Sequence, residues 1–95
     1  MYVRITPFRY DTARELEVVK FTEQQIVPAF RQLPGFRRYS GALDHDAGRG
    51  VAITEWDDLQ HAEGLRGALG PLVQRIAAVG VQLEDAQLYD IVVQA

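Results

Sequence analysis

The sequence predicts a single α+β domain over residues 1–95, in which four strands and two helical regions follow one another in the order β-α-β-β-α-β. Three observations predict it. Segments of β-forming residues alternate in polarity, two other segments carry apolar residues at helical spacing, and glycine- or proline-containing turns separate them. A length of 95 residues is that of one domain. With 47% hydrophobic and 24% charged residues, the composition is typical of a globular protein.

The first strand is expected from Met1 to Phe8 and the first helix from Ala13 to Leu33. Asp11 or Thr12 can cap this helix. Pro28 lies inside it, lacks an amide hydrogen and clashes with the preceding turn, so we expect a kink or a short break there. The apolar residues expected on one helix face are Leu16, Val19, Ile26, Phe30 and Leu33.

A hairpin is expected next, with strands at Phe36–Asp44 and Gly50–Trp56. Strict alternation in the first of these strands places Phe36 on the same face as Arg38 and opposite to Tyr39. The Asp-His-Asp sequence at positions 44–46 resembles a metal-ligand cluster by composition. Turn chemistry explains these residues better, because aspartate and glycine favour turns.

The second helical region begins after Asp57, which we expect to be its cap, and Gly70-Pro71 divides it into two pieces. Val81–Val93 alternates in polarity and is expected to be the fourth strand. The element order is that of the ferredoxin-like fold, which has a four-stranded antiparallel sheet and both helical regions on one face.

Both faces of the predicted sheet carry apolar or aromatic residues. A sheet with one face in water shows a cleaner alternation of apolar and polar residues. The second face is therefore expected to be covered too, most simply by the sheet of a second copy. The sequence thus predicts a homodimer formed through sheet faces.

Composition excludes several classes of function. The net charge is −3, and Arg37 and Arg38 are the only adjacent basic pair, which argues against nucleic-acid binding. Cysteine is absent, which excludes disulfides, thiol catalysis and cysteine-bound zinc. The first residues lack the charged start and apolar run that are typical of a signal peptide, and no apolar stretch in the sequence reaches membrane-spanning length. We therefore expect a cytoplasmic protein without a membrane partner.

Several local motifs resemble the antibiotic biosynthesis monooxygenase family, which belongs to the dimeric α/β-barrel superfamily. They are the helix end Leu33-Pro34-Gly35-Phe36, the strand through Tyr39 and Gly41, the hairpin turn at Asp46–Gly48, and the strand Val51–Trp56 followed by Asp57-Asp58 and a helix. The element order agrees over nearly the whole chain.

The resemblance implies a dimer with a cavity between each sheet and its helices. It further implies oxidation of a small aromatic or quinol substrate by O₂ without a metal, flavin or other cofactor, the substrate carbanion itself reducing the oxygen. Haem-degrading members of the superfamily use an asparagine, a tryptophan and a histidine. Trp56 matches the tryptophan, but the chain contains no asparagine and His61 lies too early in the helix. Haem degradation is therefore disfavoured.

Trp56 and His61 are the candidate catalytic residues. Trp56 ends a strand just before a helix. It can form part of a cavity wall and stack on an aromatic ligand, or it can be a core residue that packs between the sheet and the helix. His61 lies in the first turn of that helix and can act as a base toward a phenol or quinol. The positive end of the helix favours its neutral form, although a plain surface position is the simpler interpretation.

Tyr39, Arg38 and Tyr89 are the candidate substrate-binding residues. A tyrosine hydroxyl can hold a quinol oxygen, and an arginine can stabilise an enolate. Tyr39 and Arg38 point to opposite faces unless a bulge intervenes, and packing or an interface salt bridge explains each of the three equally well. Two other functions stay open: a non-catalytic or stress-responsive dimer that binds a small hydrophobic ligand, and an isomerase- or lyase-like enzyme.

Overall fold

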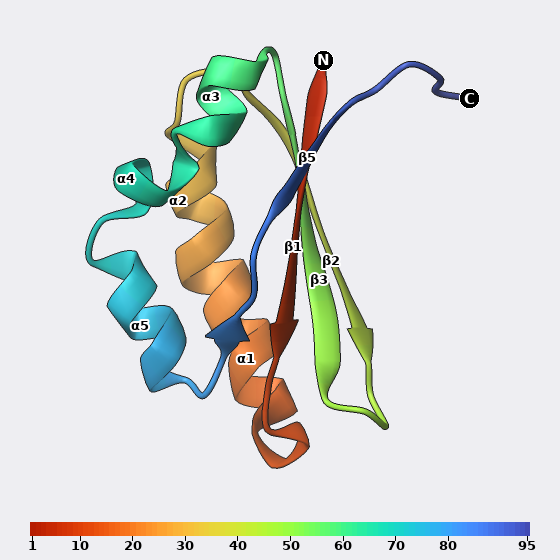
Figure 1. Ribbon diagram of the computed structural model, residues 1–95. Helices are drawn as coiled ribbons and strands as arrows, with labels where there is room; N and C mark the ends of the chain where they lie inside the picture. Colours follow the sequence, from red (N-terminus) through yellow and green to blue (C-terminus); the bar gives the residue numbers. More distant parts are fainter.

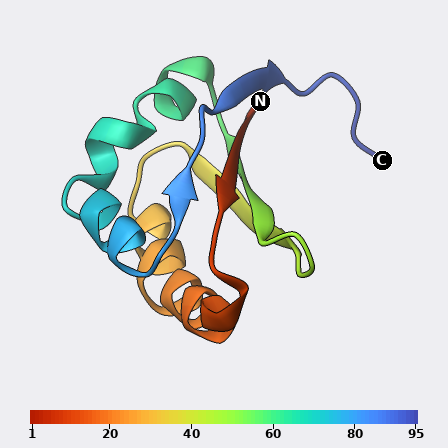
Figure 2. The same cartoon turned by 60° about the horizontal axis from the view of Figure 1, so that its bottom comes forward.

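The computed structural model describes the backbone of residues 1–95 and every side chain except that of Arg66. It confirms the α+β, ferredoxin-like class: one antiparallel sheet is covered on one face by all of the helices (Figure 1). Seen from a second direction, the helices still lie together on that face, while the β2–β3 hairpin and the C-terminal segment extend away from them (Figure 2).

The sheet has the strand order β2-β3-β1, followed by two short strands that both pair with β1. The strand bounds are β1 (Tyr2–Arg9), β2 (Phe36–Asp44), β3 (Arg49–Trp56), β4 (Gln82–Leu83) and β5 (Gln87–Asp90). The first three strands agree with the expected segments to within one residue at each end. The expected continuous fourth strand over Val81–Val93 is wrong, because it is divided into β4 and β5.

A β-bulge separates β4 from β5. Phe8 pairs with Leu83 and Ile5 pairs with Gln87, so the two residues of β1 between these pairs oppose the three residues 84–86. The extra residue disrupts the ladder and bends the strand. As a result, Leu83 faces the helices, whereas Gln87 and its alternating neighbour Tyr89 face away from them. The polarity pattern of this segment is continuous, which is why it conceals the bulge.

The N-terminal helical region starts with a 3₁₀ turn, η1 (Thr12–Arg14), capped by the side chain of Asp11. It continues as α1 (Glu15–Phe21), a π-helical turn η2 (Thr22–Ile26) and α2 (Val27–Arg31). The amide of Val27 donates to the carbonyl of Thr22, five residues back. Pro28 follows this wider turn directly, so the predicted irregularity is a π turn rather than a kink.

The π turn also changes which residues this helical region buries. One extra residue in a turn rotates the following segment by about 100° relative to an ideal α-helix. Val18, Ile26 and Phe30 are buried, whereas Leu16, expected on the apolar face, is 68% exposed. The prediction for Leu16 is therefore wrong, because it assumed one uninterrupted α-helical spacing.

The second helical region consists of three short helices, α3 (Leu59–Glu63), α4 (Leu65–Leu69) and α5 (Leu72–Ala78). The cap of α3 is Asp58 rather than Asp57: its backbone is extended and its carboxylate accepts from the amide of His61 at 2.9 Å. Asp57 forms an ion pair with Arg37 instead. The Gly70-Pro71 interruption lies between α4 and α5, as expected.

A second bulge lies in β2, between Phe36 and Arg38. Phe36 pairs with Trp56, and Tyr39 pairs with Thr54 on the same face of the sheet. Both aromatic rings therefore point toward the helices and lie 5.8 and 5.4 Å from the ring of Phe30. The expectation that Phe36 shares a face with Arg38 is wrong because Arg37 is the extra residue of the bulge.

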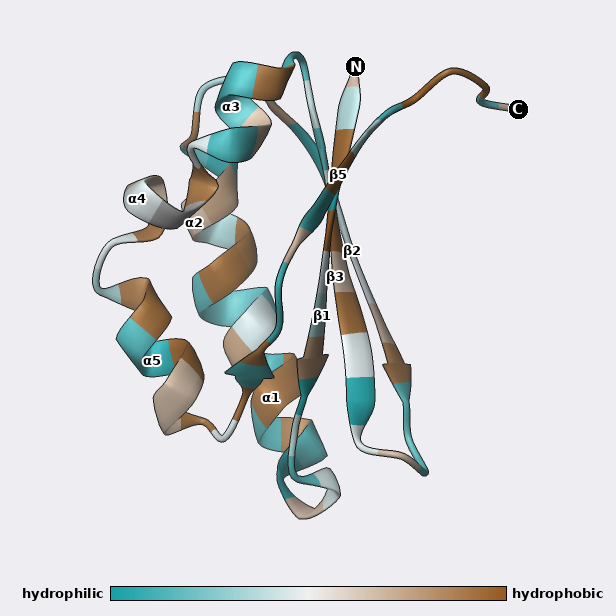
Figure 3. Ribbon diagram, viewed as in Figure 1, coloured by the Kyte–Doolittle hydropathy of each residue, from teal (hydrophilic) through white to brown (hydrophobic). Residues whose placement is uncertain are grey.

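None of the described helices covers the opposite face of the sheet (Figure 1). Val3, Ile5 and Ile53 point to this face, since their neighbours Arg4 and Thr6 point to the helices. At the C-terminus Val92 and Val93 are 84% and 83% exposed, and they form part of an apolar segment beyond β5 (Figure 3). Within the described part of the chain, every helix is too short or too polar to span a lipid bilayer.

Candidate functional site

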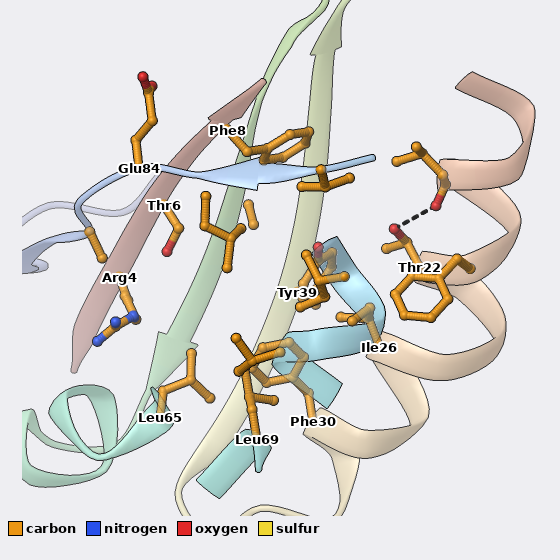
Figure 4. A pocket seen from close by; sticks show the side chains of 18 of the residues that line it. Arg4, Thr6, Phe8, Thr22, Ile26, Phe30, Tyr39, Leu65, Leu69 and Glu84 are labelled. Carbon is orange, nitrogen blue, oxygen red and sulfur yellow. Dashed lines mark hydrogen bonds between the residues drawn. The ribbon is translucent and has the colours of Figure 1, made fainter. Parts of the chain in front are cut away.

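A cavity of about 430 Å³ lies between the inner face of the sheet and the helices (Figure 4). This volume is within the range of about 300–1,000 Å³ that is usual for small-molecule sites. Most of its lining is apolar and comes from β1, the π turn, α2, α4 and the last strands. Representative apolar residues are Phe8, Ile26, Phe30, Leu65, Leu69 and Val81.

Small side chains at the middle of the sheet leave room for this cavity. Ala52 of β3 pairs with Thr6 of β1 on one side and with Gly41 of β2 on the other. These three residues form a row across the sheet on its helix-facing side. Thr6 and Ala52 line the cavity, whereas the ring of Tyr39 lies beside Gly41. The helices pack against larger aromatic side chains toward both ends of the sheet. They therefore do not contact the small residues between these ends, and space remains between the sheet and the helices.

On the sheet wall of the cavity, β1 and β2 contribute three side chains that carry hydrogen-bond donors. Arg4 and Thr6 are adjacent inward-facing residues of β1, and Tyr39 lines the cavity from β2 (Figure 4). Burial raises the pKa of Tyr39 to about 12. Its phenol therefore keeps its proton at neutral pH and can donate to a ligand oxygen.

The β4–β5 bulge brings acidic residues to the cavity. All three bulge residues, 84–86, belong to its lining. The carboxylate of Glu84 is directed away from the cavity (Figure 4) and lies 3.5 Å from Nε of Arg9. Asp85 and, from the end of α3, Glu63 are exposed lining residues, so they lie where the cavity meets solvent.

Trp56 lies outside the cavity lining and is only 1% exposed. Its ring contacts Phe30 and Phe36 edge-on at centroid distances of 6.1 and 5.6 Å. Its indole Nε1 donates to the buried hydroxyl of Thr54 at 2.8 Å. Because Phe30 lines the cavity, Trp56 packs against the side of Phe30 that faces away from the cavity.

His61 also lies outside the cavity lining, at the start of α3. Its Nδ1 is 2.8 Å from the carboxylate of Asp58, and its ring packs over Gly35. A β-carbon on Gly35 would lie 2.6 Å from this ring, and Gly35 has a positive φ of 79°. Hydrogen bonds from the amide and ring of His61 hold the pKa of Asp58 below its usual value.

Arg38 and Tyr89 lie on the sheet face that turns away from the helices, so they do not meet Tyr39 in the cavity. Arg38 is 3.7 Å from Glu55, and the hydroxyl of Tyr89 bonds to Gln87. Of the five candidate residues, only Tyr39 lines the cavity. Trp56 is its neighbour through Phe30, and the other three lie elsewhere.

The Asp-His-Asp sequence at positions 44–46 forms the expected turn. The carboxylate of Asp44 accepts from the amides of Asp46 and Ala47, each at 3.2 Å. His45 lies 2.8 Å from Glu15, whose carboxylate raises the pKa of His45. Hydrogen bonds from the hydroxyl of Tyr10 and then from His45 lower the pKa of Glu15. Among the described residues no three acidic or histidine side chains are grouped closely enough to hold a metal ion.

Sequence reasoning missed Arg4 and Thr6. Both lie in a strand that was correctly expected, and alternation alone would have placed them on the face of Phe8. Alternation alone does not identify these residues as functional. A strand has two faces, and only the face that packs against the helices can line a cavity.

Comparison with solved structures identifies proteins of the same fold. HapK from Hahella chejuensis is 14% identical over 100% of this chain and 96% of its own, with a TM-score of 0.82. A Deinococcus radiodurans protein with a provisional designation as an antibiotic biosynthesis monooxygenase is 19% identical over 100% and 96%, with a TM-score of 0.74. SnoaB, a cofactor-independent oxygenase from Streptomyces nogalater, is 21% identical over 98% and 94%, with a TM-score of 0.66.

No protein-family model matches the sequence, and no curated protein is detectably similar to it. At identities of 14–21% the agreement concerns the path of the chain rather than the residues of the site. The resemblance to antibiotic biosynthesis monooxygenases is thus confirmed in the fold, which this chain shares with structures of that family over its whole length.

Proposed function

We propose that this chain is a monooxygenase-like enzyme that oxidises a small aromatic or quinol-like substrate with O₂ and without a cofactor, in the cavity between the sheet and the helices. The observation that carries the proposal is the cavity itself: an apolar space of about 430 Å³ with hydrogen-bonding side chains on its sheet wall. The shared fold of a cofactor-independent oxygenase supports it.

The reaction suits such a cavity. A flat aromatic substrate with an acidic methylene group loses a proton, and the resulting carbanion reduces O₂. The methylene carbon becomes a carbonyl, one oxygen atom stays in the product, and the other leaves as water with the two hydrogens. An apolar enclosure with oriented donors stabilises the negative charge that develops on the substrate oxygen. The presence of Tyr39 in the cavity lining, with its phenol protonated, supports assigning this role to it.

Trp56 and His61 remain proposals for the catalytic residues. Trp56 can act only through the wall formed by Phe30, since its ring does not reach the cavity. His61 can act as a base only on a substrate that extends beyond the lining toward the start of α3. Turnover by Trp56→Phe and His61→Gln tests both roles, and rates equal to wild type would remove them from the mechanism.

The same proposal includes a cytoplasmic homodimer formed through the uncovered sheet face. The support is the apolar character of that face, where Val3, Ile5 and Ile53 lie side by side. Pairing two such faces buries them as in a layered domain. Light scattering at micromolar protein should give twice the chain mass, and a monomer mass would contradict the dimer.

Oxygen consumption with a hydroxyanthrone substrate tests the proposed reaction. We expect protein-dependent O₂ uptake, a carbonyl product that carries one atom from labelled O₂, and no product under anaerobic conditions. Product formation without O₂ would support an isomerase- or lyase-like activity instead. Tight binding of the substrate analogue without any product would indicate a non-catalytic ligand-binding protein.

A further inference from the structure

We propose that α4 is a lid over the cavity, which opens by unwinding between Gly64 and Gly70 and so admits a small molecule. The proposal shares with the proposed function only the cavity as the ligand site, and it concerns how the cavity opens rather than which reaction follows. Three observations carry it. Residues of α4 line the cavity, the helical structure of α4 is weak, and the helices on both sides are tied to distant parts of the chain.

Two leucines of α4 line the cavity on its helix side. Leu65 begins α4 and Leu69 ends it, and both side chains belong to the lining (Figure 4). Leu65 is only 6% exposed and is part of the hydrophobic core. Glu63, which lies where the cavity meets solvent, directly precedes Gly64. Displacement of α4 would therefore widen an opening that already exists.

The helical conformation of α4 has little support from its own residues. A helix of five residues is too short to be stable by itself. Its N-cap is Gly64, which has no side chain to cap the first turn. Gly70 has a positive φ of 51°, which favours glycine. Gly67 lies inside the helix, where a β-carbon would meet none of the described atoms within 4 Å, so crowding does not require a glycine there.

The helices on both sides of α4 are held by side chains from distant parts of the chain. Nη1 of Arg4 in β1 donates to the carbonyl of Ala62 in α3 at 2.9 Å. Nη2 of Arg14 in η1 donates to the carbonyl of Ala78 in α5 at 3.2 Å. The backbone of α4 lies mainly against α3 and α5, and its Ala68 amide donates to the carbonyl four residues earlier at 3.2 Å. The arrangement lets α4 move while α3 and α5 stay in place.

Opening and unwinding of α4 are expected to be one event. Local opening is easiest in segments with few buried contacts, and ligand-binding lids come from these segments. When Leu65 and Leu69 leave the cavity, α4 loses the packing that keeps it helical. A substitution that favours the helix should therefore keep the lid closed. Gly67→Ala is such a substitution, because the site has room for a β-carbon and alanine is favoured over glycine in a helix by a factor of about five.

Thiol labelling of single-cysteine variants measures the opening of α4. The chain has no cysteine of its own, so each variant carries one reporter. Leu65→Cys places the thiol in α4, and Ile26→Cys places it in η2, where the native side chain is equally buried at 6% exposure and lines the same cavity. Mass spectrometry gives the rate of modification by iodoacetamide, relative to the rate in urea. We expect Leu65→Cys to react at least about tenfold faster than Ile26→Cys.

Gly67→Ala supplies the second half of this test. In the Leu65→Cys background it should slow labelling about fivefold, and in the Ile26→Cys background it should leave the rate unchanged. Equal protection of the two thiols would overturn the proposal, as would labelling of Leu65→Cys that Gly67→Ala does not slow. If circular dichroism shows that Leu65→Cys does not fold, hydrogen exchange of wild type decides. Relative to intrinsic rates, the Ala68 amide should exchange at least about tenfold faster than the Val27 amide, and equal protection would overturn the lid.

The kinetics of ligand exchange test α4 as the route into the cavity. 2-Naphthoate is a flat fluorescent probe without an oxidisable methylene group, so stopped-flow fluorescence follows its binding alone. Gly67→Ala should lower its association and dissociation rate constants by the same factor of about five and leave Kd unchanged, because both steps require the open lid. Unchanged rate constants would overturn the role of α4 in ligand entry.

These outcomes separate the lid from the proposed function, because thiol labelling needs neither a ligand nor turnover. Labelling as expected without O₂ uptake on hydroxyanthrone would keep the lid and reject the oxygenase. Oxygen uptake with equal protection of the two thiols would do the reverse.

Discussion

The hydrogen bond between Trp56 and Thr54 allows a direct test of how the cavity wall is held. Both side chains are buried, at 1% and 2% exposure, and Nε1 of Trp56 lies 2.8 Å from Oγ1 of Thr54. Replacing either residue leaves the other polar group buried without this partner, at a cost of about 1–3 kcal/mol. Trp56→Phe also removes about two ring carbons, which adds about 1.6 kcal/mol at about 0.8 kcal/mol per buried carbon group.

We therefore expect Trp56→Phe to lower the free energy of unfolding by about 3–5 kcal/mol, and Thr54→Val to lower it by about 1–3 kcal/mol. The double variant should cost less than the sum by at least about 1 kcal/mol, because it removes both polar partners together. Urea unfolding at one fixed protein concentration measures all three values, since the stability of a dimer depends on concentration.

Additive effects would show that the hydrogen bond is not formed as described.

The Trp56→Phe variant also tests function, under conditions in which the protein is folded. Because Trp56 contacts Phe30 and not the cavity, we expect the affinity of Trp56→Phe for 2-naphthoate to change by less than about threefold. A loss of about a hundredfold would place Trp56 in direct contact with the ligand.

Three further changes test other parts of the account. Ala52→Leu extends into the cavity from the centre of the sheet, so calorimetric titration should show no binding of 2-naphthoate while the protein stays folded; unchanged binding would place the ligand elsewhere. Ile53→Lys puts a charge on the uncovered sheet face, and light scattering should then report a monomer; a persistent dimer would move the interface away from that face. Glu15 raises the pKa of His45, so the His45 proton resonances should titrate at higher pH in wild type than in Glu15→Gln. The stabilisation from this pair is present below the unfolded pKa of about 6.5 and is lost as the pH rises through the folded pKa, and identical titrations would contradict the contact.

The sequence predicts the order of the elements well, because alternating strands, helical spacing and turn residues are local signals. It fails where the backbone departs from a constant period. The π turn before Pro28 rotates Leu16 out of the core, and the bulge at Arg37 turns Phe36 toward the helices. The bulge at 84–86 sends Tyr89 to the outer face.

The candidate site is less predictable than the fold for the same reason. The residue types near a strand end suggest a site at Trp56 and His61, yet the cavity forms over Thr6 and Ala52, which pair across β1 and β3. These residues are far apart in the sequence. Their small side chains leave a cavity only because the helices pack over this part of the sheet.

The most direct test of the central claim is to locate a bound aromatic ligand by NMR. On titration with 2-naphthoate, the account predicts shifts and ligand contacts at the methyl groups of Ile26, Leu65 and Val81, which line the cavity. Methyl groups of Ile5 and Ile53 on the uncovered sheet face should be unaffected. Contacts confined to Ile5 and Ile53 would contradict the claim that the space between sheet and helices is the functional site.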